Sequence, residues 1–564
     1  MRWRCFGVLG TLALALPTQA QVPDTAHVVV VATTDVHGRA MHWDYENDRE
    51  APWGLTRAAT ALDSLRRLYP GSVVLVDAGD LLQGTPFAAY VAAVTRIDPN
   101  PVIDALNFLQ YDAATPGNHD FDFGLDLFAG AVDAAGFSYV SANVYRLPLD
   151  TFALQRTVTL RRGEVSVGIT GFTTPGVMLW DRAQLTDRLR VRRIIPEARA
   201  ALEALRGADL SVVLIHSGLD GPSSYDTTGV GPENVAAELA RLPVKPDLVV
   251  VGHSHRQIRD TVIAGVHFVQ PLPWARSLAV AHVWLVRPGG AAGAVGAAGV
   301  RAGAPRYRVV RIRADQVPLA NVAPDPQLTR RLQPVHDRVR TWAGAPIAQT
   351  EEQWSARYAR VEDTPIIDLV NEVQRRVAGA QLSSTAAFNP HAGFGPGFVR
   401  LREVAALYPY ENTLRAVRID GATLVRYLEQ SVRYFRTFTP GGPVINDSVP
   451  GFNYDVVSGV SYVIDLTRPP GSRILQLTYQ GRLVQPTDVF TLALNNYRQG
   501  GGGGFEMLTR LPVVYDRGEN IRDLLVEAVR SAGTLRAAEF FRDSWRIIPP
   551  EARERLRRAS DTAR

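Results

Sequence analysis

The first half of the chain is predicted to form an α/β fold around open sheets. Several segments are rich in β-branched and apolar residues, which is typical of strands buried on both faces. Helix-like segments lie between several of them, at 55–68, 196–206 and 232–241. Five of the strand-like segments lead into a side chain that can bind a metal ion. These observations indicate alternating strands and helices, with a ligand site beyond the strand ends.

The strand-like segments end in polar side chains of similar chemistry. In chain order they are 27–34 with Asp35 and His37, 72–76 with Asp80, 111–115 with Asn118, 210–215 with His216, and 247–251 with His253 and His255. A further strand-like segment at 164–169 carries no such residue. In open α/β sheets, ligands bind beyond the carboxyl ends of the strands. A single histidine there is more often structural, so the prediction depends on the whole set.

The stretch at 117–122 is the densest in ligand atoms. Asn118 offers a neutral oxygen, His119 an imidazole, and Asp120 and Asp122 carboxylates. On its own the stretch is equally well interpreted as a polar turn between a strand and a helix. The neighbouring strand ends favour the functional interpretation.

The number of ligand residues predicts two divalent metal ions. Seven donors with one bridging carboxylate supply about four protein ligands per ion and leave room for water and substrate. Histidine, aspartate and asparagine suit Zn, Mn, Co, Fe or Mg and do not decide among them. No covalent nucleophile is required, because Ser217 and Ser254 lie in turns without a nucleophile-elbow pattern.

Composition restricts the remaining possibilities. A chain of 564 residues is expected to contain two or more domains. Its hydrophobic content of 46% and charged content of 21% are those of a soluble globular protein, and the net charge of +5 does not indicate a nucleic-acid polymer as partner. The only cysteine is Cys5, so a mature chain without the leader has no disulfide and no cysteine-ligated metal.

Residues 1–20 are predicted to be a signal peptide. Arg2 and Arg4 precede an apolar stretch too short to span a bilayer, and Ala20 ends a small-residue cleavage site. The alternative is a buried N-terminal helix. No second apolar run is long enough for a membrane span, so we expect an exported protein, periplasmic or secreted.

The second half begins after a glycine- and alanine-rich loop at 288–305. We expect the first domain to extend over 27–315, a linker helix over 325–345, and a second domain over 347–550. The charged tail at 551–564 is expected to be a surface helix or disordered.

Aromatic residues beside turns are the main feature of the second domain. Tyr410 and Tyr497 lie near turns, and Tyr497 precedes the glycine run at 500–504. Two such rings could sandwich a nucleobase, with stacking worth about 1–3 kcal/mol per base. The alternative is that both are core tyrosines. The glycine run is not a P-loop, because no Lys-Ser/Thr follows it.

The motifs Asp-x-His, Gly-Asp, Gly-Asn-His-Asp, His-Ser-Gly and Gly-His-Ser-His occur in this order over residues 27–287. As a set they resemble the calcineurin-like dinuclear metallophosphatases, and more narrowly the exported 5′-nucleotidase superfamily. The resemblance implies an N-terminal four-layer α/β/β/α sandwich. It also implies that Asp80 bridges two metals, with Asp35, His37 and His255 on the first metal and Asn118, His216 and His253 on the second.

The same resemblance implies a role for the rest of the stretch at 117–122. His119 would stabilise charge on the phosphoryl group or protonate the leaving oxygen, and Asp122 would orient it. Asp120 matches a variable position and is expected to have no catalytic role. Metal-bound hydroxide would be the nucleophile.

Tyr-Pro-Tyr-Glu-Asn at 408–412 and Asn-Asn-Tyr-Arg at 495–498 resemble the C-terminal α+β substrate-binding domain of this superfamily. Tyr410 and Tyr497 then correspond to its stacking pair and Asn412 to its base- or ribose-contacting asparagine. Phe-Asn-Tyr-Asp-Val at 452–456 and Trp180-Asp181 are similar to the branch that hydrolyses 2′,3′-cyclic nucleotides and 3′-nucleotides. We expect a monomer acting on a small nucleotide, with domains that rotate about the linker helix.

Two residues typical of the 5′-nucleotidase branch are missing from this sequence, which bears on the choice of activity. The 5′-nucleotidase branch carries an Arg near 393–397 and an Asp in the loop after the second aromatic, and this chain has neither. A 5′-nucleotidase or UDP-sugar diphosphatase is therefore the second interpretation. A catalytically inactive nucleotide-binding or surface-interaction protein is the third, and the intact ligand set argues against it.

Overall fold

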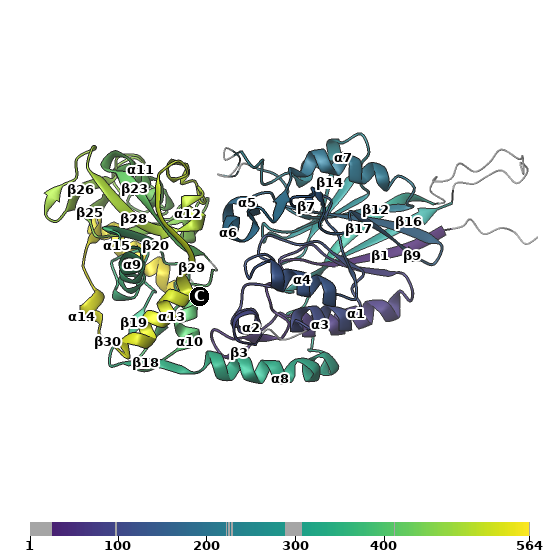
Figure 1. Ribbon diagram of the computed structural model, residues 1–564, viewed down its shortest axis with the longest axis horizontal. Helices are drawn as coiled ribbons and strands as arrows, with labels where there is room; N and C mark the ends of the chain where they lie inside the picture. Colours follow the sequence, from purple (N-terminus) through teal and green to yellow (C-terminus); the bar gives the residue numbers. More distant parts are fainter. Residues whose placement is uncertain are drawn as a thin grey trace, which may run out of the picture.

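The computed structural model describes residues 25–95, 99–221, 223, 226, 229–287, 307–410 and 412–562 (Figure 1). The expected signal peptide at 1–20 and the loop at 288–305 lie outside these residues. Within the described ranges, no helix combines the length and the apolar character needed to cross a bilayer. The N-terminal and C-terminal halves form two domains that lie side by side, with helix α8 beneath them in the view of Figure 1.

Two six-stranded sheets form the centre of the N-terminal domain. Their strand orders are β17-β16-β1-β4-β5-β6 and β14-β15-β13-β12-β10-β9. The strands of the first sheet are β1 (Thr25–Thr33), β4 (Val73–Asp77), β5 (Ala113–Ala114), β6 (Ser138–Tyr139), β16 (Ser277–Val286) and β17 (Arg308–Pro318). Those of the second are β9 (Thr157–Arg162), β10 (Val165–Thr173), β12 (Leu210–His216), β13 (Leu248–Val251), β14 (Ile258–Ile263) and β15 (Val266–Gln270).

Strand β1 shows why the sheets are buried on both faces. Val28 and Val30 lie in the core between the two sheets, whereas Val29 and Val31 lie in the core beneath the helices. Successive side chains of a strand point to opposite faces, so a continuous valine run fills both cores at once. β1, β4 and β5 run parallel, as do β10, β12 and β13, so within each set the carboxyl ends lie at one edge.

Helices cover the outer face of each sheet and complete four α/β/β/α layers, which confirms the predicted fold class. Helices α1, α3, α4 and α8 pack on the first sheet, and α7 and η2 on the second. Their bounds, with the shorter elements of this half, are α1 (Leu55–Leu68), α2 (Pro86–Tyr90), the π-helix η1 (Val91–Thr95), α3 (Pro101–Phe108), α4 (Leu125–Ala134), α5 (Val177–Trp180), α6 (Arg182–Leu185), α7 (Ile194–Ala204), η2 (Ala236–Arg241), β2 (Trp43–Asp44), β3 (Arg49–Glu50), β7 (Val144–Arg146), β8 (Thr151–Phe152) and β11 (Leu189–Val191). The helix predicted at 232–241 is only the 3₁₀ helix η2.

The C-terminal domain is α+β, as the resemblance implied. Its main sheets have the orders β24-β20-β28-β23-β29 and β27-β26-β25-β31. The strands of this half are β18 (Pro346–Thr350), β19 (Trp354–Ser355), β20 (Leu382–Ala386), β21 (Gly393–Phe394), β22 (Gly397–Arg400), β23 (Thr413–Asp420), β24 (Asp455–Ser458), β25 (Ser461–Asp465), β26 (Ile474–Tyr479), β27 (Arg482–Leu483), β28 (Val489–Asn495), β29 (Val513–Asn520), β30 (Thr534–Leu535) and β31 (Trp545–Ile548). Its helices are α9 (Pro365–Ala378), α10 (Leu401–Leu407), α11 (Gly421–Ser431), η3 (Val432–Tyr434), η4 (Gly451–Asn453), α12 (Asn496–Gln499), η5 (Glu506–Leu508), α13 (Ile521–Ala532), α14 (Ala537–Phe540) and α15 (Pro550–Thr562).

Helix α8 (Pro326–Ala343) links the two halves. It packs on α1, α2 and α3 of the first domain and on α10 of the second. Asp48, in the turn between β2 and β3, accepts a hydrogen bond from Arg340 of α8 at 2.9 Å and lies 3.0 Å from Arg402 of α10. One carboxylate therefore joins the first domain, the connecting helix and the second domain.

The tail at 551–564 is helical over the described part, as α15. Ala552 and Leu556 are buried against the core of the C-terminal domain. The tail is thus attached to the domain by apolar packing.

Candidate active site

The predicted metal ligands come from strand ends of both sheets. Asp35 and His37 follow β1, Asp80 follows β4, and Asn118 follows β5 in the first sheet. In the second sheet His216 is the last residue of β12, and the motif with His253 and His255 follows β13. The site therefore lies where the carboxyl-terminal edges of the two sheets meet.

Five of the seven predicted ligand residues have a left-handed backbone. The φ angles are 51° at Asp35, 50° at His37, 60° at Asp80, 70° at His253 and 53° at His255. Such angles are uncommon for residues other than glycine and are concentrated at functional sites. The backbone leaves the strand abruptly here, so the side chains turn toward a common centre.

The first group of donor atoms contains Asp35, His37 and His255, whose ligand atoms all lie within 4.8 Å of one another. His37 Nδ1 lies 2.9 Å from the carbonyl oxygen of Gln83, which leaves Nε2 facing the group. Burial lowers the pKa of His37 to about 3, so its ring is neutral, as a metal ligand must be. Burial raises the pKa of Asp35, but His255 and His216 lower it to about 2.

The second group contains Asp35, Asp80 and His216. Asp80 Oδ2 lies 3.1 Å from His216 Nε2 and 3.7 Å from His37 Nε2, so this carboxylate lies between the two groups. That position fits the bridging role implied for Asp80. Asp35 is the residue that belongs to both groups, which the sequence did not indicate.

Asn118 Oδ1 is buried and accepts no hydrogen bond from the described residues. His216 Nε2 is buried as well and lies 3.1 Å from the Asp80 carboxylate. The other ring nitrogen of His216 lies 2.7 Å from the carbonyl oxygen of Ala78, which orients the ring. Buried polar atoms without partners are costly unless something satisfies them, and a divalent cation would do so. The residues present therefore fit a metal centre, and the ligand role of each residue stays a prediction.

His253 differs from the other predicted ligands. Its Nε2 lies 2.5 Å from Glu233 Oε1, and its ring stacks on Trp180 at a centroid distance of 5.7 Å. Glu233 precedes η2 and had no signal in the sequence.

The close packing of the strand ends explains two glycines. A Cβ atom on Gly117 would lie 2.2 Å from Asp80 Oδ1, and one on Gly252 would lie 2.4 Å from Thr34 Oγ1. Any side chain at these two positions would displace a loop that carries a predicted ligand.

His119 and Asp122 form the pair that the resemblance implied. His119 Nδ1 lies 2.8 Å from Asp122 Oδ2, and the backbone N–H of His119 donates to Asp80 Oδ1 at 2.8 Å. Burial lowers the pKa of His119, but the carboxylates of Asp122 and Asp80 raise it to about 10. The imidazole is then protonated at neutral pH, with Nε2 available to a phosphoryl or leaving oxygen.

Asp120 has a structural role that the sequence did not suggest. Its carboxylate accepts hydrogen bonds from the backbone N–H groups of Asp80 and Gly117 on one oxygen, and of Leu81 and Leu82 on the other, at 2.8–3.0 Å. It therefore holds the loop after β5 against the loop after β4, and with it the relative positions of Asn118 and Asp80.

Asp120→Ala is expected to lower the free energy of unfolding by about 3–5 kcal/mol, because four buried N–H groups lose their acceptor. Urea unfolding measures this difference. Asp133→Ala is the matched control, since Asp133 is exposed on α4 and should change stability by less than about 0.5 kcal/mol. Equal stability of the two variants would refute this role.

A cavity of about 250 Å³ joins this site to the C-terminal domain. The residues that line it come from both domains and are Asn118, His119, Asp122, Trp180, Asp181, Glu233, His253, Asn412, Asn496 and Tyr497. The structure thus brings Asn412 and Tyr497, predicted from the sequence, into one cavity with His119 and Asp122.

Tyr410 does not line this cavity. Its ring packs edge-on against Phe388 at a centroid distance of 5.2 Å, and 37% of the residue is exposed. Its role as the second stacking ring stays a prediction.

Trp180, Asp181, Glu233 and Asn496 line the cavity but were given no role from the sequence. Trp180 and Asp181 contributed to the resemblance, and Asn496 precedes Tyr497 in a motif that was recognised. Their position in one cavity with His119 and Asp122 depends on the contact between the two domains, and no local sequence pattern shows that contact.

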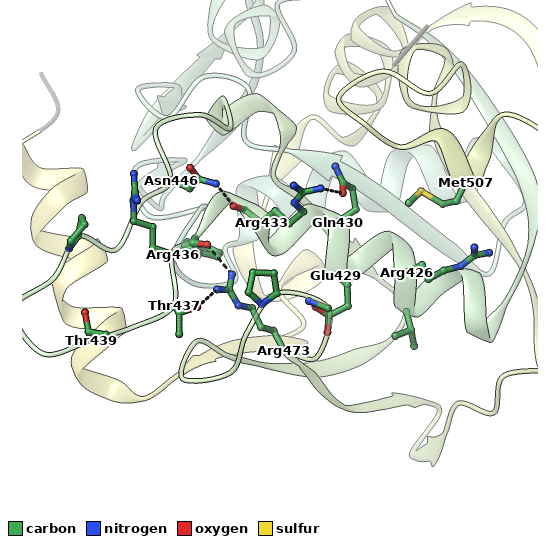
Figure 2. Close-up of a pocket in the computed structure, with 15 residues that line it drawn as sticks. Arg426, Glu429, Gln430, Arg433, Arg436, Thr437, Thr439, Asn446, Arg473 and Met507 are labelled. Carbon is green, nitrogen blue, oxygen red and sulfur yellow. Dashed lines mark hydrogen bonds between the residues drawn. The ribbon is translucent and has the colours of Figure 1, made fainter. Parts of the chain in front are cut away.

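A second cavity, of about 860 Å³, lies in the C-terminal domain and contains no predicted site residue. Arg426, Arg433, Arg436 and Arg473 line it (Figure 2). Arg473 is fully buried and donates to the carbonyl oxygens of Val432 and Phe435 and to the hydroxyl of Thr437. These bonds give Arg473 a structural role in the wall of this cavity.

Comparison with known proteins agrees with this geometry. Residues 28–257 match the calcineurin-like phosphoesterase family, and residues 346–510 match the 5′-nucleotidase C-terminal domain. The chain is 30% identical over 594 residues to the 2′,3′-cyclic-nucleotide 2′-phosphodiesterase/3′-nucleotidase of Haemophilus influenzae, with 93% of this chain and 88% of that protein covered. It is 28% identical over 610 residues to the trifunctional nucleotide phosphoesterase of Bacillus subtilis, covering 95% of this chain and spanning 40% of that protein.

A solved structure supports the same assignment. A Staphylococcus aureus protein, provisionally called a 5′-nucleotidase, superposes with a TM-score of 0.77 at 25% identity, covering 93% of this chain and 100% of that one. The chain therefore belongs to the calcineurin-like metallophosphoesterases that carry a 5′-nucleotidase C-terminal domain, and it is a metallophosphoesterase.

Proposed function

We propose that this enzyme opens 2′,3′-cyclic nucleotides and then removes the 3′-phosphate of the resulting 3′-nucleotides. The observation that carries the proposal is the shared cavity, which places His119 and Asp122 opposite Asn412 and Tyr497. A phosphoester and a nucleobase on one small molecule can therefore meet both sets of residues. The position of the phosphate rests on the similarity to the Haemophilus influenzae protein.

The residues divide the work as follows. Asp35, His37, Asp80, Asn118, His216, His253 and His255 would hold two divalent cations. When bound, these cations would supply Lewis-acid charge and lower the pKa of water. His119, held by Asp122, would stabilise charge on the phosphoryl group and donate its Nε2 proton to the leaving oxygen. Tyr497 would stack on the base, and Asn412 would contact the base or ribose.

The second candidate is a 5′-nucleotidase or UDP-sugar diphosphatase, and the similarity to the Staphylococcus aureus structure favours it. The glycine loop at 500–504 argues against it, because the acidic residue that the 5′-nucleotidase branch carries in this loop is missing here. Assays with Mn²⁺ on 2′,3′-cAMP, 3′-AMP, 5′-AMP and UDP-glucose separate the two. We expect kcat/KM to be highest for the first two substrates, and a preference for 5′-AMP would reverse the assignment.

Tyr497→Ala is expected to raise KM for 2′,3′-cAMP by about 5- to 160-fold with kcat changed less, because stacking contributes about 1–3 kcal/mol of binding. Initial-rate kinetics over a range of substrate concentrations measure both constants. Tyr497→Phe keeps the ring and is the matched control. An unchanged KM in Tyr497→Ala would show that the ring belongs to the core and not to the substrate site.

The remaining proposals concern the whole molecule. We propose that residues 1–20 direct export to the periplasm or medium and that the mature enzyme is a monomer. Catalysis would reside in 27–315 and base recognition in 347–550, with 325–345 as the linker about which the domains rotate. Absence of turnover on every phosphoester would instead support an inactive binding protein.

A further inference from the structure

One amide connects helix α12 to the catalytic domain. Asn496 Nδ2 donates to the carbonyl oxygen of Trp180 at 2.9 Å, while its Oδ1 accepts from the backbone N–H of Thr413 at 3.0 Å. Asn496 begins α12, the helix that carries Tyr497, and Trp180 ends α5, which faces α12 in Figure 1. The base-binding helix is therefore attached directly to the segment Trp180–Asp181.

This segment also touches both parts of the catalytic machinery. The Trp180 ring stacks on His253 with an interplanar angle of 24°. Asp181 lines the same cavity as Asp122 and His119, and its carboxyl group hydrogen-bonds to that of Asp122, whose Oδ2 lies 2.8 Å from His119 Nδ1. A continuous chain of contacts thus runs from Asn496 through Trp180–Asp181 to His119.

We propose that Asp181 is a positioning residue for the His119–Asp122 pair, and that Asn496 couples its placement to the docking of the base-binding helix. The inference rests on the proposed phosphoesterase site. Asp181 and Asn496 would connect the binding of the base to the position of His119 in that site. Asp181 acts on the reaction only through Asp122, so its effect should fall on kcat.

The chemistry of the carboxyl pair explains how Asp181 would act. Two carboxyl groups within hydrogen-bond distance cannot both be ionised without a large electrostatic cost, so one keeps its proton. Burial and the neighbouring Asp122 raise the pKa of Asp181 well above its usual range. The protonated Asp181 donates to Asp122, which remains free to accept from His119. Asp122 is then held on both sides and the imidazole is fixed in direction.

The test compares Asp181→Ala with Asp181→Asn, using 2′,3′-cAMP and bis(p-nitrophenyl) phosphate as substrates. Asn can donate the same hydrogen bond from its amide, and Ala cannot. We expect kcat to fall about 10- to 100-fold in Asp181→Ala with KM within about threefold, as for other partners that orient a catalytic group. Asp181→Asn should keep at least about a third of wild-type kcat.

Asp181→Ala activity equal to wild type, or a tenfold loss in Asp181→Asn, would overturn the inference. If Asp181→Ala does not fold, a tenfold loss of kcat in Asp181→Asn still overturns the inference, because only the loss of the hydrogen-bond donor is predicted to matter. Melting temperature and bound metal content are measured for each variant, so that a loss of structure is separated from a loss of rate. Asp126→Ala, with an exposed carboxylate on α4, is the matched control.

A double-mutant cycle tests the coupling. Asn496→Ala alone should lower kcat/KM more for 2′,3′-cAMP than for bis(p-nitrophenyl) phosphate, which has no base to dock. If both residues act through one chain of contacts, the double variant should lose little more than Asp181→Ala alone. Losses that simply multiply would refute the coupling.

The proposed phosphoesterase function and the positioning role of Asp181 can be refuted separately. A wild-type enzyme inactive on all phosphoesters would remove the proposed function and the inference with it. An active enzyme with a different nucleotide preference leaves the test intact, because bis(p-nitrophenyl) phosphate reports on Asp181 without a base. An active enzyme indifferent to Asp181→Ala would remove the inference alone.

Discussion

Asp80→Ala should abolish turnover, with kcat reduced by at least about 1,000-fold on 2′,3′-cAMP. Asp80 is buried, and its Oδ2 lies between His216 Nε2 at 3.1 Å and His37 Nε2 at 3.7 Å. Its removal would take away the carboxylate that lies between the two groups of donors and leave Asp35 as the carboxylate they share, so bound metal should also be lost. Metal content measured by mass spectrometry and steady-state kinetics with added Mn²⁺ check both effects.

Asp80→Asn is the informative companion variant. It keeps the size of the side chain and an oxygen that can accept from the backbone N–H of His119. It removes the negative charge, so metal binding should weaken while the fold remains intact. Asp133→Ala, with its exposed carboxylate, should behave like wild type in both assays. Full activity of Asp80→Ala with wild-type metal content would rule out a bridging role for this residue.

His119→Ala should lower kcat by about 100- to 10,000-fold, which is the usual contribution of a positioned general acid. Bound metal should stay near the wild-type level, because His119 belongs to neither group of donor atoms. This separates it from Asp80→Ala, where rate and metal are expected to fall together. If His119→Ala keeps a kcat near that of wild type, or loses its bound metal, then His119 is not the general acid.

The pH dependence gives an independent check on the same pair. His119 must be protonated to donate, so activity should fall as pH rises through its pKa. The Asp122 and Asp80 carboxylates raise that pKa, and Asp122→Asn removes the larger of these two contributions. The alkaline limb of kcat against pH should therefore move to lower pH by about 1 unit or more in Asp122→Asn. If the alkaline limb does not move in Asp122→Asn, the group that titrates there is not His119.

The sequence was most informative where a local pattern has one physical cause. The helix predicted at 55–68 and the strand predicted at 210–215 agree with α1 (Leu55–Leu68) and β12 (Leu210–His216), because apolar periodicity reflects which face is buried. The segment at 232–241 looked helical by composition, and only its last part forms a 3₁₀ helix. The first part of this segment belongs to the loop that carries Glu233. The remaining residues form the short helix η2, whose apolar side chains pack on the second sheet.

Site residues were predictable where they lie next to a strand end or in a recognisable motif. Asp35, His216 and His119 are of this kind. Asp120 was not, because its carboxylate serves backbone N–H groups of a loop about forty residues away in sequence. Asp181 and Asn496 were not, because their roles depend on which surfaces of the two domains face each other.

The sequence by itself determined the four-layer and α+β fold classes, the candidate ligand set around Asp80, and the His119–Asp122 pair. The candidate ligand set follows from burial periodicity and from side-chain chemistry at strand ends, which are properties of short stretches. The four layers, the α+β second domain and the His119–Asp122 pair follow from the resemblance of the motifs to a known family. Only the tertiary structure decided that the two groups of donors share Asp35, that Tyr497 lines one cavity with His119 while Tyr410 packs on Phe388, and that helix α12 bonds to the carbonyl of Trp180. Contacts between distant segments depend on how the two sheets and the two domains pack. The apolar pattern of one segment shows which of its faces is buried, but not which distant segment covers that face.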